Sequence, residues 1–186
     1  TSDVLEIVNN TNAAFTTATN YAVTLSGTTS AANANTIMND TTGVVTATVT
    51  ATGAVPDLNT ALANASATDA LTLVLDATSA SAADLNTLNG KTSVNINAAT
   101  ITDITSSSAD DVNTVVANIT EIGLDGNFNV ILSDTTLSAA EVKTINAGTS
   151  GTINMSLATI ISSSTASDVL EIVQNTGAAF TTASNY

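Results

Sequence analysis

The sequence lacks cysteine, histidine, tryptophan and arginine, and it has one proline. Its two basic residues are Lys91 and Lys143. Zinc and haem sites, thiol chemistry and the common catalytic triads need residues that are missing here. Charged residues make up 10% of the chain and aromatic residues 3%, whereas about 25% charged residues is usual for globular proteins. We therefore expect no enzymatic activity and no catalytic, cofactor-binding or metal-binding residue.

Positive charge is equally scarce. Sixteen acidic residues outnumber the two lysines and give a net charge of −14 at pH 7. A protein that follows nucleic-acid phosphates needs a basic surface, so we expect no nucleic-acid partner. Apolar runs stay below the roughly 18 residues that a membrane helix needs, and the sequence shows no signal peptide. We expect no membrane span within this sequence.

Small residues dominate instead. Thr (36), Ala (31), Asn (21) and Ser (19) together account for 107 of the 186 residues. A chain that combines this composition with so little lysine is typical of secreted and surface proteins of bacteria. The composition therefore predicts an extracellular or cell-surface location.

A long repeat relates the two ends of the sequence. Residues 2–21 are SDVLEIVNNTNAAFTTATNY, and residues 167–186 are SDVLEIVQNTGAAFTTASNY. The two segments lie 165 residues apart and differ at three positions, Asn9/Gln174, Asn12/Gly177 and Thr19/Ser184. We interpret residues 1–186 as a single repeat array. One 165-residue period spans about 2–166, and the next begins at 167–186.

A shorter unit recurs within that period. Its core is an acid or Asn, an apolar residue, a polar residue, Thr and a second apolar residue, found as NANTI (33–37), DLNTA (57–61), DLNTL (84–88), DVNTV (111–115) and EVKTI (141–145). DVLEI at 3–7 and 168–172 is a related form. Successive cores lie 24 to 30 residues apart, so six units of about 27 residues fill one period. Repeats of roughly 20–45 residues are typical of solenoids.

Each unit combines a helix pattern with a strand pattern. Apolar pairs three residues apart, such as Leu85/Leu88 and Val142/Ile145, predict one buried helix face. A Ser or Thr suited to helix capping stands upstream of most pairs, at Ser30, Ser81, Ser108, Ser138 and Thr165. β-Branched runs predict strands at 21–26, 44–50, 70–76, 93–97, 128–133 and 152–157. The intervening turns contain Gly43, Gly90, Gly148 and Gly151, where we expect positive φ angles.

Strands and helices that alternate at this spacing require parallel strands with crossover connections. We predict an α/β fold, a right-handed solenoid of short strand-helix units with a parallel β ladder and with helices at 84–89 and 141–147. The high Thr and Val content leaves an all-β solenoid as the alternative. The two ends carry the same apolar residues and no charged cap, so we expect copies of the chain, or neighbouring repeats of a longer chain, to stack head to tail.

One acidic or amide side chain per unit stands at the predicted helix start. The column consists of Asp3, Asn33, Asp57, Asp84, Asp111, Glu141 and Asp168. A calcium ladder is one interpretation, since Ca²⁺ prefers several oxygen ligands, but the glycine- and aspartate-rich calcium nonapeptide is absent. We favour helix-start acids that interact with the helix dipole.

Two further patterns have a structural and a functional interpretation. Threonine occupies every second position of residues 46–52, which on a flat strand would order water as an ice-binding surface does. We favour an ordinary solvent-facing strand, because the other predicted strands lack this alternation. Asp40, Asp76 and Asp134 lie at predicted turns, where Asp commonly forms local hydrogen bonds.

The segments LDATSASAADLNTLNGKTSVNINAATIT and LSDTTLSAAEVKTINAGTSGTINMSLATI resemble the Thr-, Ala-, Ser- and Asn-rich tandem repeats of giant bacterial cell-surface and adhesin-like proteins, such as those of cyanobacteria. The resemblance extends over essentially the whole sequence. It implies a structural role outside the cell, as a surface filament, sheath or adhesin stalk. The alternative is a binding module that grips carbohydrate, ice or another cell, although Tyr21 and Tyr186 are the only tyrosines available as sugar platforms.

Overall fold

The computed structural model describes residues 2–9, 17–162, 164–174 and 180–182. Helices form at the predicted apolar pairs, and one short additional helix was not expected from the sequence. The helices are α1 (Ser2–Val8), α2 (Ala31–Asp40), α3 (Val55–Ala61), α4 (Ala82–Asn89), α5 (Ala109–Ala117), α6 (Ile119–Ile122), α7 (Ala139–Gly148) and α8 (Ala166–Gln174), of which α6 is the unexpected one. The predicted helices at 84–89 and 141–147 are therefore confirmed. In the described part of the chain, no helix is long and apolar enough to cross a membrane.

The strands between the helices form three separate sheets. They are β1 (Val23–Ser30), β2 (Val45–Ala51), β3 (Ala70–Leu75), β4 (Ser79–Ala80), β5 (Asp103–Ser107), β6 (Asn129–Leu132), β7 (Thr136–Ser138), β8 (Ile153–Met155), β9 (Ile160–Ser162) and β10 (Phe180–Thr182). The sheet orders are β1-β2-β3, β10-β8-β6-β5-β4 and β7-β9, and every pairing between these strands is parallel. The predicted α/β class with parallel strands is confirmed, and the all-β alternative is wrong.

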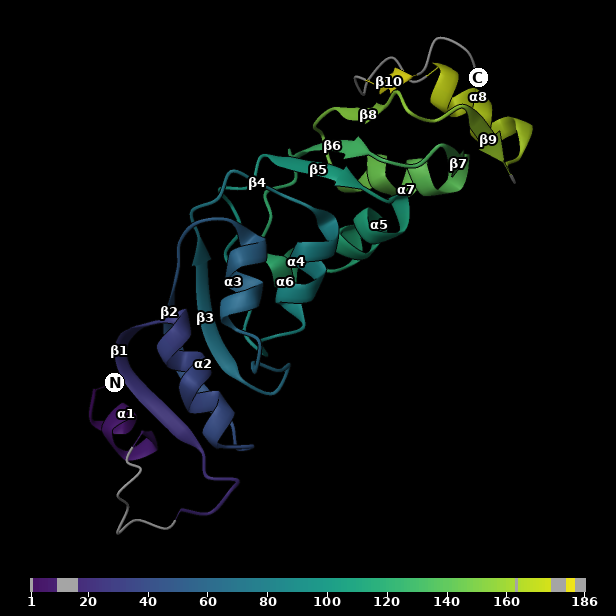
Figure 1. Cartoon of the computed structure of the whole chain (residues 1–186). Coiled ribbons are helices and arrows are strands. Elements are labelled where there is room, and N and C mark those ends of the chain that lie inside the picture. Colours follow the sequence, from purple (N-terminus) through teal and green to yellow (C-terminus); the bar gives the residue numbers. More distant parts are fainter. Residues whose placement is uncertain (1, 10–16, 163, 175–179, 183–186) are drawn as a thin grey trace.

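The molecule is elongated, with α1 at one end and α8 at the other (Figure 1). Consecutive helices pack on one another in the order α1, α2, α3, α4, α5, α7, α8. We call this row of helices the helix seam. The strands run alongside it, and the buried side chains of both layers form one continuous core. Each unit therefore packs chiefly against the units before and after it.

Two patterns of apolar residues build the core: every second residue of a strand such as β2 and every third residue of a helix such as α4 is buried. In β2, Val45, Ala47, Val49 and Ala51 are buried and the threonines between them are exposed. Successive side chains of a strand point to opposite faces, so one face of β2 packs on the helices and the other contacts solvent. In α4, Ala82, Leu85 and Leu88 are buried. Full burial of one such leucine contributes about 1.5–3 kcal/mol.

The predicted strand at 93–97 is wrong. This segment forms only an isolated bridge, between Val74 and Asn97. On its other side, the backbone N–H of Ile96 donates to the carbonyl oxygen of Glu121 in α6, 2.7 Å away. Because a short helix occupies the place of the next strand, the ladder is interrupted there and continues in the second sheet.

Four short strands, β4, β5, β7 and β9, lie just before helices and were not expected from the sequence. They pair with one another or with β6, so Ala80 lies opposite Ile104 and Leu137 opposite Ile161. Short segments of Thr, Ser and Ile have no periodicity of their own. They become strands because each pairs in parallel with a segment of the neighbouring unit.

The turn glycines differ from their expected geometry. Positive φ angles occur at Gly27, Gly53 and Gly123, and not at Gly43, Gly90, Gly148 or Gly151. Three of the latter are constrained by space instead. A Cβ at Gly43 or Gly151 would collide with the backbone of Tyr21 or Phe128, and one at Gly148 with the Val116 side chain. At these turns the requirement for glycine comes from close approach between units.

Candidate functional site

Five helices of the seam, α2, α4, α5, α7 and α8, begin with a capping hydroxyl, whereas the residue before α3 is Ala54, which forms no side-chain cap. The side chains of Ser30, Ser81, Ser108 and Ser138 accept a hydrogen bond from the backbone N–H three residues later, at 3.1–3.2 Å. Thr165 accepts the same bond from Asp168 at 3.1 Å. These bonds satisfy N–H groups that have no partner inside the helix. The predicted caps are confirmed.

The acids of the helix-start column interact with these caps. Ser108 Oγ donates to the carboxylate of Asp111 at 2.7 Å, and Ser81 donates likewise to Asp84. At α7, the backbone N–H and the hydroxyl of Ser138 both donate to Glu141 Oε2, which completes a capping box. Among the described residues there is no cluster of three or more potential metal ligands. At Asp84, Asp111, Glu141 and Asp168 the geometry is thus that of helix capping, whereas α3, which contains Asp57, has no side-chain cap.

The third residue of the five-residue core links neighbouring helices of the seam. Asn59 Nδ2 donates to the carbonyl oxygen of Asp84 at 2.9 Å, and Asn86 Nδ2 donates to that of Asp111 at 3.0 Å. The donor and acceptor residues are 25 positions apart in both cases. In α7 a lysine stands at this position, and Lys143 Nζ contacts Asp168 Oδ1 of α8 at 2.8 Å, again 25 positions on. In three units, at Asn59, Asn86 and Lys143, this side chain therefore binds the start of the next helix.

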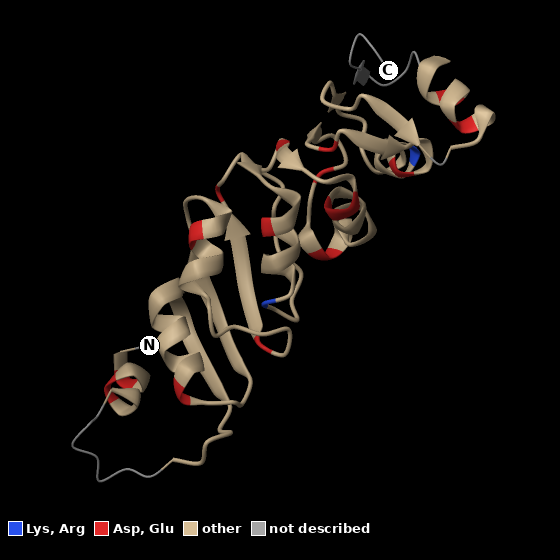
Figure 2. Ribbon diagram, turned by 45° about the vertical axis from the view of Figure 1, so that its right-hand side comes forward, with Lys and Arg blue, Asp and Glu red and all other residues tan. Residues whose placement is uncertain are grey.

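Lys143 of α7 is the one basic residue within the helices of the seam. Figure 2 shows how few blue basic residues stand among the red acidic ones. Lys143 forms ion pairs with Asp168 at 2.8 Å and with Glu171 at 2.9 Å. The hydrogen bond to Asp168, followed by that to Glu171, raises the pKa of Lys143 above its ordinary value. The hydrogen bond from Lys143, followed by that from Thr165, lowers the pKa of Asp168. All of these side chains are partly exposed, so the pair contributes orientation more than stability.

The seam also contains acceptors without a donor. The side-chain Oδ1 atoms of Asn59, Asn86 and Asn113 are buried and have no hydrogen-bond partner within the described part of the chain. All three occupy the third position of the five-residue core. Because an unsatisfied buried acceptor costs about 1–3 kcal/mol, part of the stability gained from the donating Nδ2 groups of Asn59 and Asn86 is offset.

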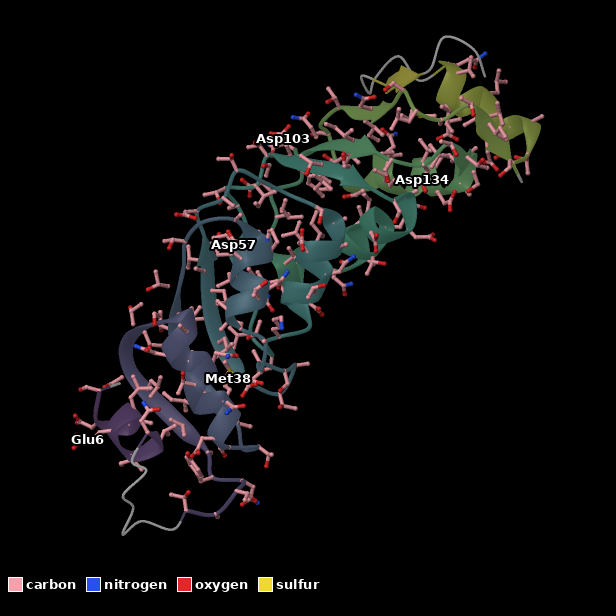
Figure 3. The ribbon with its side chains drawn as sticks, in the orientation of Figure 1. Glu6, Met38, Asp57, Asp103 and Asp134 are labelled. Carbon is pink, nitrogen blue, oxygen red and sulfur yellow. The ribbon has the colours of Figure 1, made fainter. Side chains whose placement is uncertain are left out.

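The turn aspartates bind neighbouring units, which corrects their expected local role. Asp76 Oδ1 accepts from the backbone N–H of Gly53 at 2.8 Å, and Asp134 Oδ2 accepts from that of Ala109 at 2.8 Å. The partners are 23 and 25 positions away in the sequence. Figure 3 shows Asp134 near the helix seam, at the end of β6. Asp40 instead accepts from the phenol of Tyr21.

Three buried threonines form links that sequence reasoning missed. Thr41, Thr92 and Thr149 each follow a helix and donate to a backbone carbonyl of the preceding unit, on Tyr21, Leu71 and Phe128 respectively. Each also accepts the backbone N–H two residues later. The recurring sequence signal is Thr-Thr or Thr-Ser just after a helix, which is hard to recognise in a chain so rich in both residues.

Hydroxyl groups cover the outer face of the β1-β2-β3 sheet. Thr28, Thr48 and Thr72 are exposed and lie opposite one another across the three strands. Exposed Thr24 and Thr46 form a second row. The register of β1 shifts between Thr24 and Thr28, so threonines four residues apart align with threonines two residues apart in β2. The alternation of 46–52 is not repeated along β3, where exposed Val74 follows Thr72 two residues later, but single threonines of β1 and β3 align with it across the sheet.

A hollow of about 410 Å³ lies beside the turn after α2 and is lined by Asp40, Thr42, Asn64, Ser66 and Asp69, among others. Its carboxylates have protein partners. Asp69 accepts from the backbone N–H groups of Val45 and Ser66. Burial, followed by the hydrogen bond to Asp40, raises the pKa of Tyr21 to about 12. These contacts hold the turn after α2 against the neighbouring segments.

The two copies of the end helix expose different faces. In α8, Ile172 is 9% exposed while Leu170 and Val173 are 52% and 58% exposed. In α1, the equivalent of Ile172 is Ile7, which is 48% exposed. The equivalents of Leu170 and Val173 are Leu5 and Val8, which are partly buried and pack against the core. The same helix sequence thus packs a different set of apolar residues against the core at each end of the molecule.

The sequence matches no protein-family model, and neither a curated protein nor a solved structure matches it.

Proposed function

We propose that this chain is a structural repeat protein of the cell exterior, a right-handed solenoid that forms part of a surface filament, sheath or adhesin stalk. The observation that carries the proposal is the recurrence of the same contacts from unit to unit. Asn59, Asn86 and Lys143 each bind the residue 25 positions later. An array built on such contacts lengthens by adding units, because its stability is a sum of unit and nearest-neighbour terms.

The elongated shape and the bonding pattern support a mechanical role. Charged side chains hydrogen-bond within the array: Glu141 binds a helix cap, Asp134 binds a backbone N–H of a neighbouring unit, and Lys143 binds the next helix. The net charge of −14 gives mutual repulsion between laterally adjacent molecules. Such repulsion keeps filaments apart at low ionic strength and weakens at high salt.

The location and the role can be tested on intact cells of the source organism. Antibodies raised against residues 17–162 are applied to unpermeabilised cells and detected by gold labelling in electron microscopy. We expect labelling along surface fibres or a sheath, and loss of that structure when the gene is deleted. Labelling seen only after permeabilisation would reject the extracellular role.

The threonine face of β1-β2-β3 favours a second candidate, a surface that orders water or ice. Thr28, Thr48 and Thr72 present a row of hydroxyl and methyl groups at the roughly 4.8 Å spacing of adjacent strands. This activity predicts inhibition of ice recrystallisation by the wild-type chain. The variant Thr48→Tyr, which disrupts the row, should lose the inhibition, while Thr87→Tyr on the exposed side of α4 should keep it. Absence of inhibition by the wild-type chain would eliminate this candidate.

A further inference from the structure

The SDVLEIV helix has two packing faces, and each copy of it uses one. Against α7, helix α8 buries Ile172 and packs Val169 against the core. Against α2, helix α1 packs Leu5 and Val8 against the core. Ile7 is exposed where Ile172 is buried, and Leu170 and Val173 are exposed where Leu5 and Val8 are partly buried. Val4 and Val169 pack against the core in both copies. A helix with both faces apolar is suited to a position between two neighbours.

The open face of α1 borders an apolar hollow. Val4, Ile7 and Val8 of α1 line this space of about 430 Å³ together with Tyr21 and Val23, among others. At the other end of the molecule, Ile172 is the equivalent of Ile7 and is covered by packing on α7. The surface that fits the open side of α1 is therefore one like that of α7.

Charge identifies the same partner. Lys143 of α7 holds Asp168 and Glu171 of α8 at 2.8 and 2.9 Å. The equivalents of these acids in α1 are Asp3 and Glu6. Both are exposed, Glu6 lies on the outer side of α1 (Figure 3), and neither has a cation partner among the described residues. The acid pair and the apolar residue that α8 offers to α7 are thus also present, unpaired, on α1.

We propose that a second copy of the chain docks head to tail through this helix, its α1 taking the place of α8 on α7. In this arrangement Asp3 and Glu6 of the second copy pair with Lys143, and Ile7 takes the place of Ile172. Each SDVLEIV helix then has α7 on one side and α2 on the other, and one 165-residue period separates successive copies. The proposal names the partner within the filament proposed above, and it rests on that function for its biological role.

The resident α8 competes with the incoming helix. It is tethered to its own α7, and short tethers correspond to effective concentrations of roughly millimolar. The wild-type chain is therefore expected to be mainly a single copy at micromolar concentration. Exchange becomes visible when the bond between α8 and Lys143 is broken while α1 keeps its acids.

The test uses the full chain with the substitutions Asp168→Lys and Glu171→Lys. Repulsion from Lys143 releases α8, and α1 of another copy can then dock. Light scattering coupled to size exclusion at about 100 µM and low salt should give masses of two or more copies. The matched control carries Asp3→Lys and Glu6→Lys in addition, and it should elute with the mass of one copy.

Circular dichroism checks that both variants are folded. We expect them to be, because the substitutions lie on the terminal helices α1 and α8 and leave the central units unchanged. Assembly of the double variant alone supports the proposal. A double variant that is folded and has the mass of one copy would overturn it. Equal assembly of the control would also overturn it, because the ends would then associate without the acid pair. Neither result depends on where the protein is found on cells, so failure here differs from failure of the filament function.

Discussion

The side-chain amide of Asn86 in α4 donates to the main-chain carbonyl of Asp111 in α5, with 3.0 Å between Nδ2 and the oxygen. Asn59 of α3 makes the same bond to Asp84 of α4. The asparagine of the five-residue core is therefore a link between neighbouring helices and not a solvated surface residue. Because its acceptor belongs to the backbone, the link does not depend on the side chain at the next helix start.

Replacement of Asn86 by Asp tests this link. The substitution removes the donor and places a carboxylate against the carbonyl oxygen of Asp111. We expect the free energy of unfolding at pH 7 to fall by about 2 kcal/mol, the scale of a lost bond plus an unpaired buried group. The measurement is urea unfolding followed by circular dichroism. Asn95→Asp at an exposed position adds the same charge and should change stability by less than about 0.5 kcal/mol.

The buried hydroxyl of Thr92 should contribute substantially to the free energy of unfolding. Thr92 Oγ1 donates to the carbonyl of Leu71 and accepts from the N–H groups of Leu71 and Val94. Thr92→Val keeps the shape but leaves these groups unpaired, so we expect a loss of about 3 kcal/mol in unfolding free energy. Thr72→Val, the same change on the exposed face of β3, should be nearly neutral. Equal effects of the two variants would contradict the role given to Thr92.

Gly151 and Gly126 form a matched pair for close packing between units. A Cβ at Gly151 would collide with the backbone of Phe128, whereas one at Gly126 would meet no atom within 4 Å. Gly151→Ala is expected to destabilise the chain by about 2–3 kcal/mol through overpacking. Gly126→Ala should leave the melting temperature close to that of the wild type. The measurement is the melting temperature of both variants, and equal values for the two would contradict the close approach at Gly151.

Docking of α8 should depend on pH through Lys143 and Asp168. The bond from Lys143 lowers the pKa of Asp168 below its ordinary 3.8. A lowered carboxyl pKa gives stability that is present above pH 3.8 and is lost as the pH falls through the lowered value. Because the pKa of Lys143 is raised above 10.5, its contribution is lost only above that pH. An NMR titration should place the midpoint of Asp168 below 3.8 in the wild type and nearer 3.8 in Lys143→Met.

Metal chelation should leave the fold unchanged. The acids of the helix-start column occur once per unit, and Asp84, Asp111 and Glu141 bind capping serines. We expect the melting temperature with EDTA to equal that with calcium within about 1 °C, since binding to the folded state alone would raise it. A large rise on adding calcium would show that the column binds metal ions.

Local signals in the sequence were sufficient for the helices of the seam, although not for the short α6. The cap at Ser81, the acid at Asp84 and the apolar residues Leu85 and Leu88 all lie within one short segment, and the structure has them in the predicted roles. Capping and helix spacing depend on residues at most four positions apart. For the same reason the class of the fold, helices alternating with parallel strands, could be predicted from the sequence.

Contacts between units were decided only by the tertiary structure. The strand partner of Ala80 is Ile104, the acceptor of Asn86 is on Asp111, and the row of Thr28, Thr48 and Thr72 depends on a register shift in β1. These partners are 20 or more residues apart, and their pairing depends on how one unit stacks on the next. The sequence by itself determined where the capped helices begin and which positions of each helix and strand are apolar, because these follow from neighbouring residues. Stacking determined which strands pair, where the ladder is interrupted by α6, and which face of the SDVLEIV helix stays open at each end, because these depend on side chains that meet only after the units have packed.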